Sequence, residues 1–138
     1  MSFRRGITVA VMLVVAIAAG AQFASASNPA TLLGGCMKSW TPYKVPHGTD
    51  TILTAHSSNS GCYAGAFQNC LERSSWQGYV KLHCNSWHPT SQVHDEKVSG
   101  CLRGKYDYHT FQDYITPSEA EYWLFSEAYK AFVCRVTV

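Results

Sequence analysis

The sequence predicts an α+β fold: a small antiparallel sheet with one or two short helices, stabilised by disulfide bonds. Three observations lead to this prediction. Residues 116–138 join a helix-start signature to an alternating apolar segment, residues 77–84 form a second alternating segment, and the chain of 138 residues contains six cysteines. Alternation with a period of two is typical of a half-buried strand, and an even set of cysteines is typical of a disulfide framework.

The first 26 residues are predicted to be a signal peptide. Arg4 and Arg5 form a basic start, residues 8–19 are an apolar run, and Ala24-Ser25-Ala26 supplies the small side chains found before a cleavage site. The apolar run is shorter than the roughly 20 residues that span a membrane. We therefore expect cleavage after Ala26 and no stable membrane span in the mature chain.

The segment Leu32-Leu33-Gly34-Gly35-Cys36 offers a second processing hypothesis, because it resembles the lipobox of a lipidated protein. It lies well beyond the apolar run, so the membrane segment and the cleavage site would be out of register. Lipidation of Cys36 would also leave five cysteines, an odd number that strands one thiol. The signal-peptide prediction is therefore preferred.

The mature chain, residues 27–138, has the length of a single domain. Removing Arg4 and Arg5 leaves nine basic and nine acidic side chains, so the formal net charge of +2 falls to zero. The basic residues are scattered along the sequence and acidic residues accompany most of them. Nucleic-acid binders normally show a clustered positive surface, so no nucleic-acid partner is expected.

Taken in order, the mature chain begins with a flexible lead-in at residues 27–35. Residues 36–54 fit either a loop or a short strand, and residues 55–61 have the composition of a turn-rich connector. Residues 62–71 are predicted to form a short helix, which Gly65 weakens by about 1 kcal/mol. Residues 77–84 are predicted to form a strand, with Val80, Leu82 and Cys84 facing one side and Tyr79, Lys81 and His83 the other.

Beyond this strand, residues 85–100 are polar and are predicted to be a loop or an irregular edge. Residues 101–114 carry too many aromatic side chains for a solvated link. Thr116-Pro117-Ser118-Glu119 combines a capping hydroxyl, a proline and a glutamate, the signature of a helix start. The helix would bury Trp123 in the core, and residues 130–138 would follow as a strand. Its inward side chains would be Phe132, Cys134, Val136 and Val138.

All six cysteines lie in the mature part of the chain, and they predict three disulfide bonds: the residues are Cys36, Cys62, Cys70, Cys84, Cys101 and Cys134. Disulfides persist in oxidising compartments, so the expected location is secreted or associated with the cell envelope. Each bond can add about 2–4 kcal/mol against a typical total stability of about 5–15 kcal/mol. We therefore expect reduction to unfold the protein.

Candidate catalytic residues cluster within fourteen positions of one another: His83, His88, His94, Asp95 and Glu96. A histidine paired with a glutamate can act as a general base and acid in small secreted ribonucleases. The spacing fixes no geometry, however, and a polar surface loop explains the same residues. The sequence contains no Gly-x-Ser-x-Gly motif, and no catalytic residue is assigned.

The sequence predicts no metal or other cofactor. The spacings His83-x4-His88 and His88-x5-His94 suit zinc ligands, but neither belongs to a known ligand set, and cysteines in disulfides are not ligands. The remaining signal is aromatic, with four tryptophans and eight tyrosines. Trp40, Trp76 and Trp87 lie beside polar or turn residues, so both a core and a binding surface stay open for them.

The C-terminal half of the chain resembles the septum-formation domain family, over roughly residues 70–136. The resembling features are Val80-Lys81-Leu82-His83-Cys84 followed by His88, then Cys101 followed by Tyr106 and Tyr108, and finally the ending with Pro117, Trp123 and Cys134. Members of that family are small exported or membrane-tethered bacterial domains with four cysteines. They usually have a longer, alanine-rich helical insert where this chain has sixteen residues between Cys84 and Cys101, and Cys36 and Cys62 have no counterpart.

The resemblance implies a disulfide pairing and a cellular role. Cys70 would pair with Cys84 and Cys101 with Cys134, which leaves Cys36 for Cys62, one of 15 possible connectivities. The implied role is in septum or cell-envelope processes. The sequence thus predicts a small secreted, non-enzymatic binding or envelope-associated domain whose partner is a protein or an envelope component. Two alternatives remain: a small hydrolase of RNA or cell-wall material that uses His83, His88, His94 and Glu96, and a secreted inhibitor or effector that presents the segment between Cys84 and Cys101.

Overall fold

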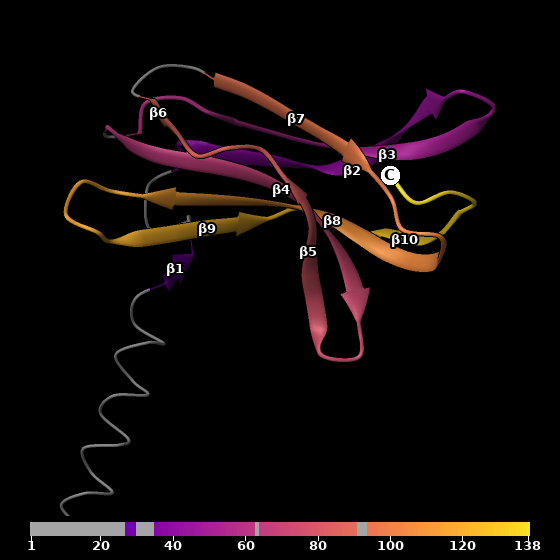
Figure 1. Cartoon of the computed structure of the whole chain (residues 1–138). Coiled ribbons are helices and arrows are strands. Elements are labelled where there is room, and N and C mark those ends of the chain that lie inside the picture. Colours follow the sequence, from indigo (N-terminus) through magenta and orange to yellow (C-terminus); the bar gives the residue numbers. More distant parts are fainter. Residues whose placement is uncertain (1–26, 30–34, 63, 91–93) are drawn as a thin grey trace, which may run out of the picture.

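A computed structural model describes residues 27–29, 35–62, 64–90 and 94–138 (Figure 1). The predicted signal peptide lies outside the described residues, as does most of the lipobox-like segment. Every regular element in the described ranges is a β-strand, arranged in two sheets. The predicted α+β class is therefore wrong, and the domain is all-β. The described ranges contain no helix that could span a membrane.

The smaller sheet has the strand order β2-β3-β7, with bounds β2 (Met37–His47), β3 (Asp50–Asn59) and β7 (His94–Gly100). The larger sheet contains β1 (Ser27–Pro29), β4 (Gly65–Ser75), β5 (Gly78–Cys84), β6 (His88–Thr90), β8 (Gly104–Ile115), β9 (Glu121–Phe125) and β10 (Tyr129–Cys134). Its central strands β4 and β8 pair along most of their length. Beyond β4 lie β5 and β6, and beyond β8 lie β9 and β10.

The two sheets form a Greek-key sandwich. For comparison with other sandwiches, β1 is set aside, β5 and β6 are counted together as the fourth strand, and β9 and β10 are counted together as the seventh. The smaller sheet then holds the first, second and fifth strands, and the larger sheet holds the fourth, third, sixth and seventh in that order. Immunoglobulin constant domains differ from this order in their fourth strand, which pairs with the fifth instead of the third. The strand pairs are antiparallel, except that β1 adds to the edge of β9 in parallel. Strand order describes the fold and does not by itself indicate a function.

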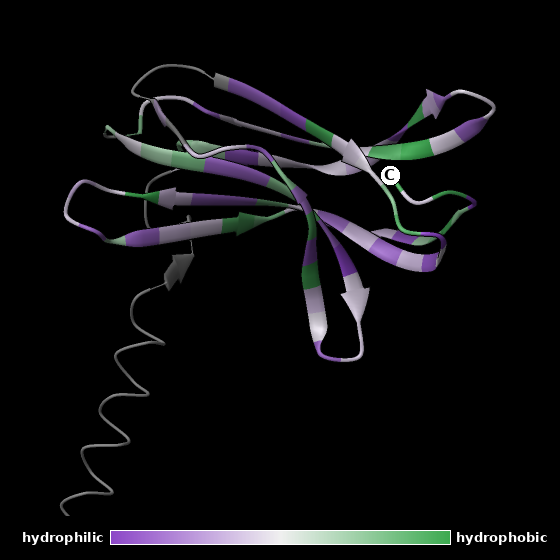
Figure 2. Ribbon diagram, in the orientation of Figure 1, coloured by the Kyte–Doolittle hydropathy of each residue, from purple (hydrophilic) through white to green (hydrophobic). Residues whose placement is uncertain are grey.

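The interior contains two apolar clusters with polar side chains between them. The larger cluster includes Leu53, Leu71, Tyr108 and Phe132, and the smaller one consists of Met37, Phe67 and Tyr114. Between them, along the inner face of β8, lie Thr110 and Gln112, and on β4 lies Asn69. Figure 2 shows that both sheets carry hydrophilic as well as hydrophobic residues along their strands.

The polar interior side chains connect the two sheets. Asn69 Nδ2 donates to the carbonyl oxygens of Ala55 and Glu96, at 3.3 and 3.2 Å. Thr110 Oγ1 donates to the Trp40 carbonyl oxygen at 2.7 Å, and Gln112 Nε2 reaches the carbonyl oxygen of Ser58 at 3.3 Å. Buried polar groups require such partners, so these bonds help to set how the sheets are placed against each other.

Three disulfides join the strands: Cys36–Cys62, Cys70–Cys84 and Cys101–Cys134. They are the three pairs that the family resemblance implied, and no cysteine is left free. The structure thus contains a small disulfide-stabilised domain, and a framework of this kind suits an oxidising, extracytoplasmic environment. Because Cys36 is bonded to Cys62, its sulfur is not a free site for a lipid.

The predicted C-terminal helix is wrong because its start signature closes a turn instead. Ala120 N donates to Thr116 Oγ1 at 3.0 Å, and Thr116 N donates to the Ala120 carbonyl oxygen at 2.9 Å. Glu119 has a φ of 67°, a left-handed conformation that ends any helix at this point. The following aromatic residues belong to strand β9. Trp123, predicted to lie in the core, is half-buried and faces outward.

The helix predicted at residues 62–71 is also wrong, because most of this segment belongs to strand β4. Phe67, Asn69 and Leu71 alternate toward the interior. A Cβ atom on Gly65 would overlap the Tyr114 ring and the carbonyl oxygen of Ile115, so the glycine permits β4 and β8 to approach closely. The glycine that seemed to weaken a helix thus favours a strand pair.

Two segments predicted to be irregular are strands as well. Residues 55–59 of the predicted connector belong to β3, and their side chains Ser57 and Asn59 point into the sandwich and are 0% and 2% exposed. The loop predicted at residues 85–100 contains β6 and β7. Polar composition is compatible with an edge strand such as β7, where every second side chain faces water.

The two strands predicted from alternation are present. The segment 77–84 is β5, and a bulge opposite Leu71 and Glu72 turns Cys84 to the outer face, where it joins Cys70. The final segment contains β10, which ends at Cys134. Its predicted inward residues do pack in the larger apolar cluster: Phe132, Cys134, Val136 and Val138.

Candidate functional site

The candidate functional site lies on the outer face of the larger sheet. Strand β8 alternates between the two faces, so that Tyr108, Thr110, Gln112 and Tyr114 point inward. His109, Phe111 and Asp113 therefore point outward. Phe111 is 8% exposed and His109 is 7% exposed, although neither belongs to the interior. Neighbouring side chains on the outer face must therefore cover them.

The covering side chains form a row of rings across the sheet. We call the following five residues the aromatic row: Tyr79, His109, Phe111, Trp123 and Phe125. The Tyr79 and His109 rings stack with centroids 3.8 Å apart, and His109 and Phe125 follow at 4.8 Å. Phe125 lies 5.0 Å from Phe111 and 4.8 Å from Trp123. Pairs at such distances stabilise each other beyond simple burial, so the row is a rigid surface.

An open depression of about 470 Å³ lies over this row, lined by Glu72, Tyr79, His109, Phe111 and Phe125. Its rim is apolar and accessible, since Phe125 is 43% exposed and Tyr79 is 36% exposed. Burial raises the pKa of the Tyr79 hydroxyl above its ordinary value, so the group is a neutral hydrogen-bond donor at physiological pH. The depression thus offers ring surface with one hydroxyl at its edge.

Glu72 and His109 form the polar base of the depression. His109 Nε2 lies 2.6 Å from Glu72 Oε1, and the two side chains are 9% and 8% exposed. Tyr79 on β5 and Phe125 on β9 approach the imidazole from opposite sides of β8. With one nitrogen bonded to Glu72 and both ring faces covered, the imidazole has little room to exchange a proton with a substrate. The pair fits a structural role in a binding site better than general acid–base chemistry.

A pair of carboxyl groups lies beside the row. Asp113 is 4% exposed. Loss of water around its carboxyl group, together with a hydrogen bond and repulsion from Glu121, raises the pKa of Asp113 to about 7, although Lys81 acts in the opposite direction. The ammonium group of Lys81 also lies 5.2 Å from the centre of the Phe111 ring. Charged groups thus border the aromatic row at β5 and at β8.

The hairpin of β4 and β5 projects from the body of the sandwich beside this face (Figure 1). Trp76 lies in its turn and is 91% exposed, more than any other large hydrophobic side chain in the described part of the chain. The disulfide Cys70–Cys84 ties the two strands together where the hairpin leaves the sheet. Of the tryptophans that the sequence left open, Trp76 therefore belongs to the surface, and Trp40 and Trp87 are also exposed, at 42% and 40%.

The candidate catalytic residues whose side chains the structure describes take part in separate contacts. His83 is hydrogen-bonded to the Val138 carbonyl oxygen and touches Gly100. Glu96 is hydrogen-bonded to Asn85. On β7, Glu96 lies four residues before Gly100, which corresponds to about 13 Å along a strand. The side chains of His88 and His94 lie outside the described part of the structure. These residues provide no joint active site in the described ranges.

Asp95 takes part in a separate contact on the smaller sheet. His56 Nε2 lies 3.1 Å from Asp95 Oδ1, and the Trp40 ring stacks on the imidazole with centroids 4.3 Å apart. Asp95 is exposed, so solvent weakens this ion pair. Nor do three or more His, Cys, Asp or Glu side chains approach one another closely enough to hold a metal ion, among the residues that the structure describes.

Sequence reasoning missed the aromatic row because its members come from three strands. The period-two pattern His109, Phe111, Asp113 in residues 101–114 was the available signal. It would have placed these side chains on one face of a strand, but without the partners Tyr79 and Phe125, which are far away in the sequence. Comparisons with protein-family models, with curated proteins and with solved structures found no match for this chain.

Proposed function

We propose that the protein is a small exported binding module without enzymatic activity, and that it recognises a partner protein with the aromatic row and the Trp76 hairpin. The observation that carries this proposal is the exposure of Tyr79 and Phe125 on the rim of a depression, beside a tryptophan that is 91% exposed. Exposed apolar surface of this kind is typical of interaction sites.

The chemistry of the surface favours a protein as the partner. Tryptophan and tyrosine are enriched at the centres of protein interfaces, where they fill pockets and exclude water. Here a projecting indole and a neighbouring depression provide both a side chain that can enter a pocket and a pocket that can receive a side chain. The disulfide Cys70–Cys84 holds the hairpin in place before binding, which lowers the entropy cost of association.

The cellular setting is the second part of the proposal. The disulfide framework supports an extracytoplasmic location. The resemblance to the septum-formation domain family supports a partner in the cell envelope and a link to septum or envelope processes. A secreted inhibitor or effector would use the same surface on another organism's protein. The segment between Cys84 and Cys101, first considered for that role, is mostly β6 and β7 rather than a free loop.

The alternative of a small hydrolase receives less support from the geometry. His83 and Glu96 are each bonded to other groups. The buried pair Glu72 and His109 is the best arranged acid–base pair among the described residues, but stacked rings cover the imidazole. A binding role explains both the pair and the rings around it.

The test compares capture by immobilised full-chain variants from the extracytoplasmic fraction of the producing cells. A partner should be retained by the wild type and by Trp40→Ser, which removes an exposed tryptophan from the smaller sheet. Trp76→Ser and Phe125→Ser should lose it. The partner, once purified, should bind both variants at least about tenfold more weakly, a loss of about 1.4 kcal/mol.

Three outcomes would contradict the proposal. One is equal binding by all variants. Another is hydrolysis of RNA or peptidoglycan that disappears in His88→Ala with His94→Ala while the fold stays intact. The third is concentration-dependent dimerisation in sedimentation equilibrium that Trp76→Ser abolishes, because the surface would then bind a second copy of the chain rather than a different protein.

A further inference from the structure

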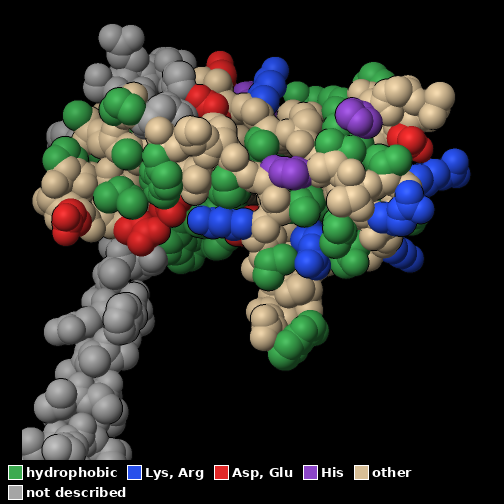
Figure 3. All heavy atoms as spheres, viewed as in Figure 1, with side chains coloured by type: hydrophobic (Ala, Val, Ile, Leu, Met, Phe, Trp, Pro, Cys, Tyr) green, Lys and Arg blue, Asp and Glu red, His purple; other side chains and the backbone are tan. Residues whose placement is uncertain are grey.

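A second surface lies at the end of the sandwich where the β2–β3 turn approaches β10. Figure 3 shows Lys and Arg side chains gathered toward this end, while most Asp and Glu side chains lie toward the opposite end. The basic residues of this end come from four segments of the chain and are Lys44, Arg103, Lys105, Lys130 and Arg135. The mature chain is neutral by count, but the fold separates its charges.

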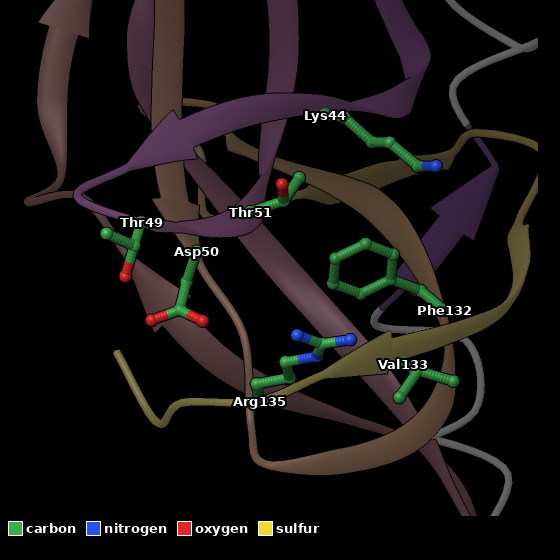
Figure 4. A pocket seen from close by; sticks show the side chains of 7 residues that line it. All are labelled: Lys44, Thr49, Asp50, Thr51, Phe132, Val133 and Arg135. Atoms are coloured by element: carbon green, nitrogen blue, oxygen red, sulfur yellow. The ribbon is translucent and has the colours of Figure 1, made fainter.

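This basic end contains a depression of about 350 Å³. Lys44 of β2 and Arg135, just after β10, line it from different segments of the chain, and the Phe132 ring lies between them (Figure 4). Thr49, in the β2–β3 turn, and Thr51, on β3, add two hydroxyl groups to its lining. The lining thus combines two cations with hydroxyl donors.

Neither cation of the depression forms a close ion pair with a described carboxylate. Lys44 and Arg135 have no carboxylate within 4 Å in the described residues, and the Lys44 ammonium lies over the Tyr129 ring at 5.8 Å. Asp107, an acidic residue close to β10, already contacts other groups of the protein. The Ala131 amide donates to Asp107 Oδ1 over 2.7 Å, Lys130 lies 3.5 Å away, and these contacts hold the pKa of Asp107 below its ordinary value.

We propose that this depression binds a phosphate or sulfate ester carried by a polyhydroxyl ligand. The guanidinium group of Arg135 presents paired donors that match the oxygens of such esters, and Lys44 adds a second positive charge. Asp50 is the one carboxylate in the lining, and it disfavours a bare anion by repulsion. It can accept hydrogen bonds from hydroxyl groups on the same ligand, so it favours an ester over the free ion.

This site is separate from the aromatic row and uses different residues. Its occupation does not depend on the proposed partner protein, so each proposal can fail alone. The probes are glucose 6-phosphate, glucose 6-sulfate, inorganic phosphate and glucose. Titration of the full chain by calorimetry should give saturable binding of the two esters, weaker binding of inorganic phosphate and none of glucose. Binding of the esters should weaken as salt is added, because the contacts are exposed.

The variants identify the site. Lys44→Ala and Arg135→Ala should each weaken ester binding at least about tenfold, as expected for loss of a charge-assisted hydrogen bond. Arg135→Lys should lose part of the affinity. Asp50→Asn should strengthen the binding of inorganic phosphate and narrow its difference from the esters. Lys38→Ala, at the far end of β2, is the matched control and should leave binding unchanged.

Lys38, Lys44 and Arg135 are exposed and Asp50 is half-buried. Thermal unfolding should therefore be the same for the lysine and arginine variants, and it is measured for every variant, which separates lost binding from lost folding. The proposal is overturned if the esters show no saturable binding at millimolar concentration. It is also overturned if Lys44→Ala and Arg135→Ala bind as tightly as Lys38→Ala.

Discussion

His109 Nε2 and Glu72 Oε1 lie 2.6 Å apart on the outer face of the larger sheet, and both side chains are less than 10% exposed. The two residues are direct partners on β8 and β4. A carboxylate held at a sheet surface in this way is unusual, because charged groups are normally solvated. Rings of the aromatic row shield the pair from water, and they position it at the base of the candidate binding site.

Glu72→Ala should lower the free energy of unfolding by about 1–3 kcal/mol, because it leaves the buried imidazole without its acceptor. Glu72→Gln keeps a hydrogen-bonding oxygen and should cost less. Urea unfolding followed by tryptophan fluorescence measures both. If the two variants have the same midpoint as the wild type, the pair is not buried as described.

Stability should also depend on pH through Asp113. Its pKa is raised to about 7 from an ordinary value of 3.8, so the folded state holds a proton that the unfolded state releases between these values. The free energy of unfolding should therefore decrease as pH rises from about 4 to 7, by up to about 1.4 kcal/mol per pH unit.

Asp113 and Asp107 affect the pH dependence of stability in opposite directions. Asp113→Asn should remove the decrease between pH 4 and 7. The pKa of Asp107 is lowered, so its stabilising effect is present above pH 3.8 and is lost as the pH falls below that value. Asp107→Asn should therefore lower the free energy of unfolding above pH 3.8 and leave the decrease caused by Asp113 in place. An unchanged pH dependence in Asp113→Asn would show that the raised pKa of Asp113 is not its cause.

The interior polar contacts should be sensitive to substitution. Asn69→Ala removes two hydrogen bonds that connect β4 to the smaller sheet, at the Ala55 and Glu96 carbonyl oxygens. We expect a loss of about 2–3 kcal/mol, since each buried bond is worth about 1 kcal/mol and its acceptors stay buried. Gln68→Ala, at the next position of the same strand, faces outward and donates one bond to the Asn85 carbonyl oxygen, so it should cost less. Equal losses would argue against Asn69 as a link between the sheets.

Each disulfide should contribute to stability according to the loop that it closes. The sequence separations are 26, 14 and 33 residues, which correspond to about 3–4 kcal/mol each in the chain-entropy model. Replacing Cys70 and Cys84 together by serine should leave a folded but less stable protein. Circular dichroism should show loss of the β signal when all three bonds are reduced. A folded, fully reduced protein would contradict this expectation.

The sequence was informative where a signal is local. Alternation identified β5 and the inward set of β10, and the even number of cysteines indicated the disulfide framework. It failed where one local motif serves two structures: Thr116, Pro117 and Glu119 start helices in many proteins, but here tertiary pairing of β8 with β9 closes them into a turn. Gly65 was also misread from the sequence, because its lack of a side chain serves to let the Tyr114 ring approach closely.

Both candidate sites were beyond reach of the sequence for a single physical reason. Tyr79 and Phe125 approach His109 only after β5, β8 and β9 join one sheet, and Lys44 approaches Arg135 only after the two sheets stack. Each site therefore depends on pairings between distant segments, which no local pattern encodes.

The disulfide connectivity tests this account most directly, because Cys70–Cys84 fixes β5 beside β4 and Cys101–Cys134 fixes β10 beside the start of β8. The measurement is peptide mapping by mass spectrometry of non-reduced, alkylated protein. We expect no alkylated thiol and three linked peptide pairs, Cys36 with Cys62, Cys70 with Cys84, and Cys101 with Cys134. A free thiol, or any peptide that links Cys70 or Cys134 to a different cysteine, would contradict it.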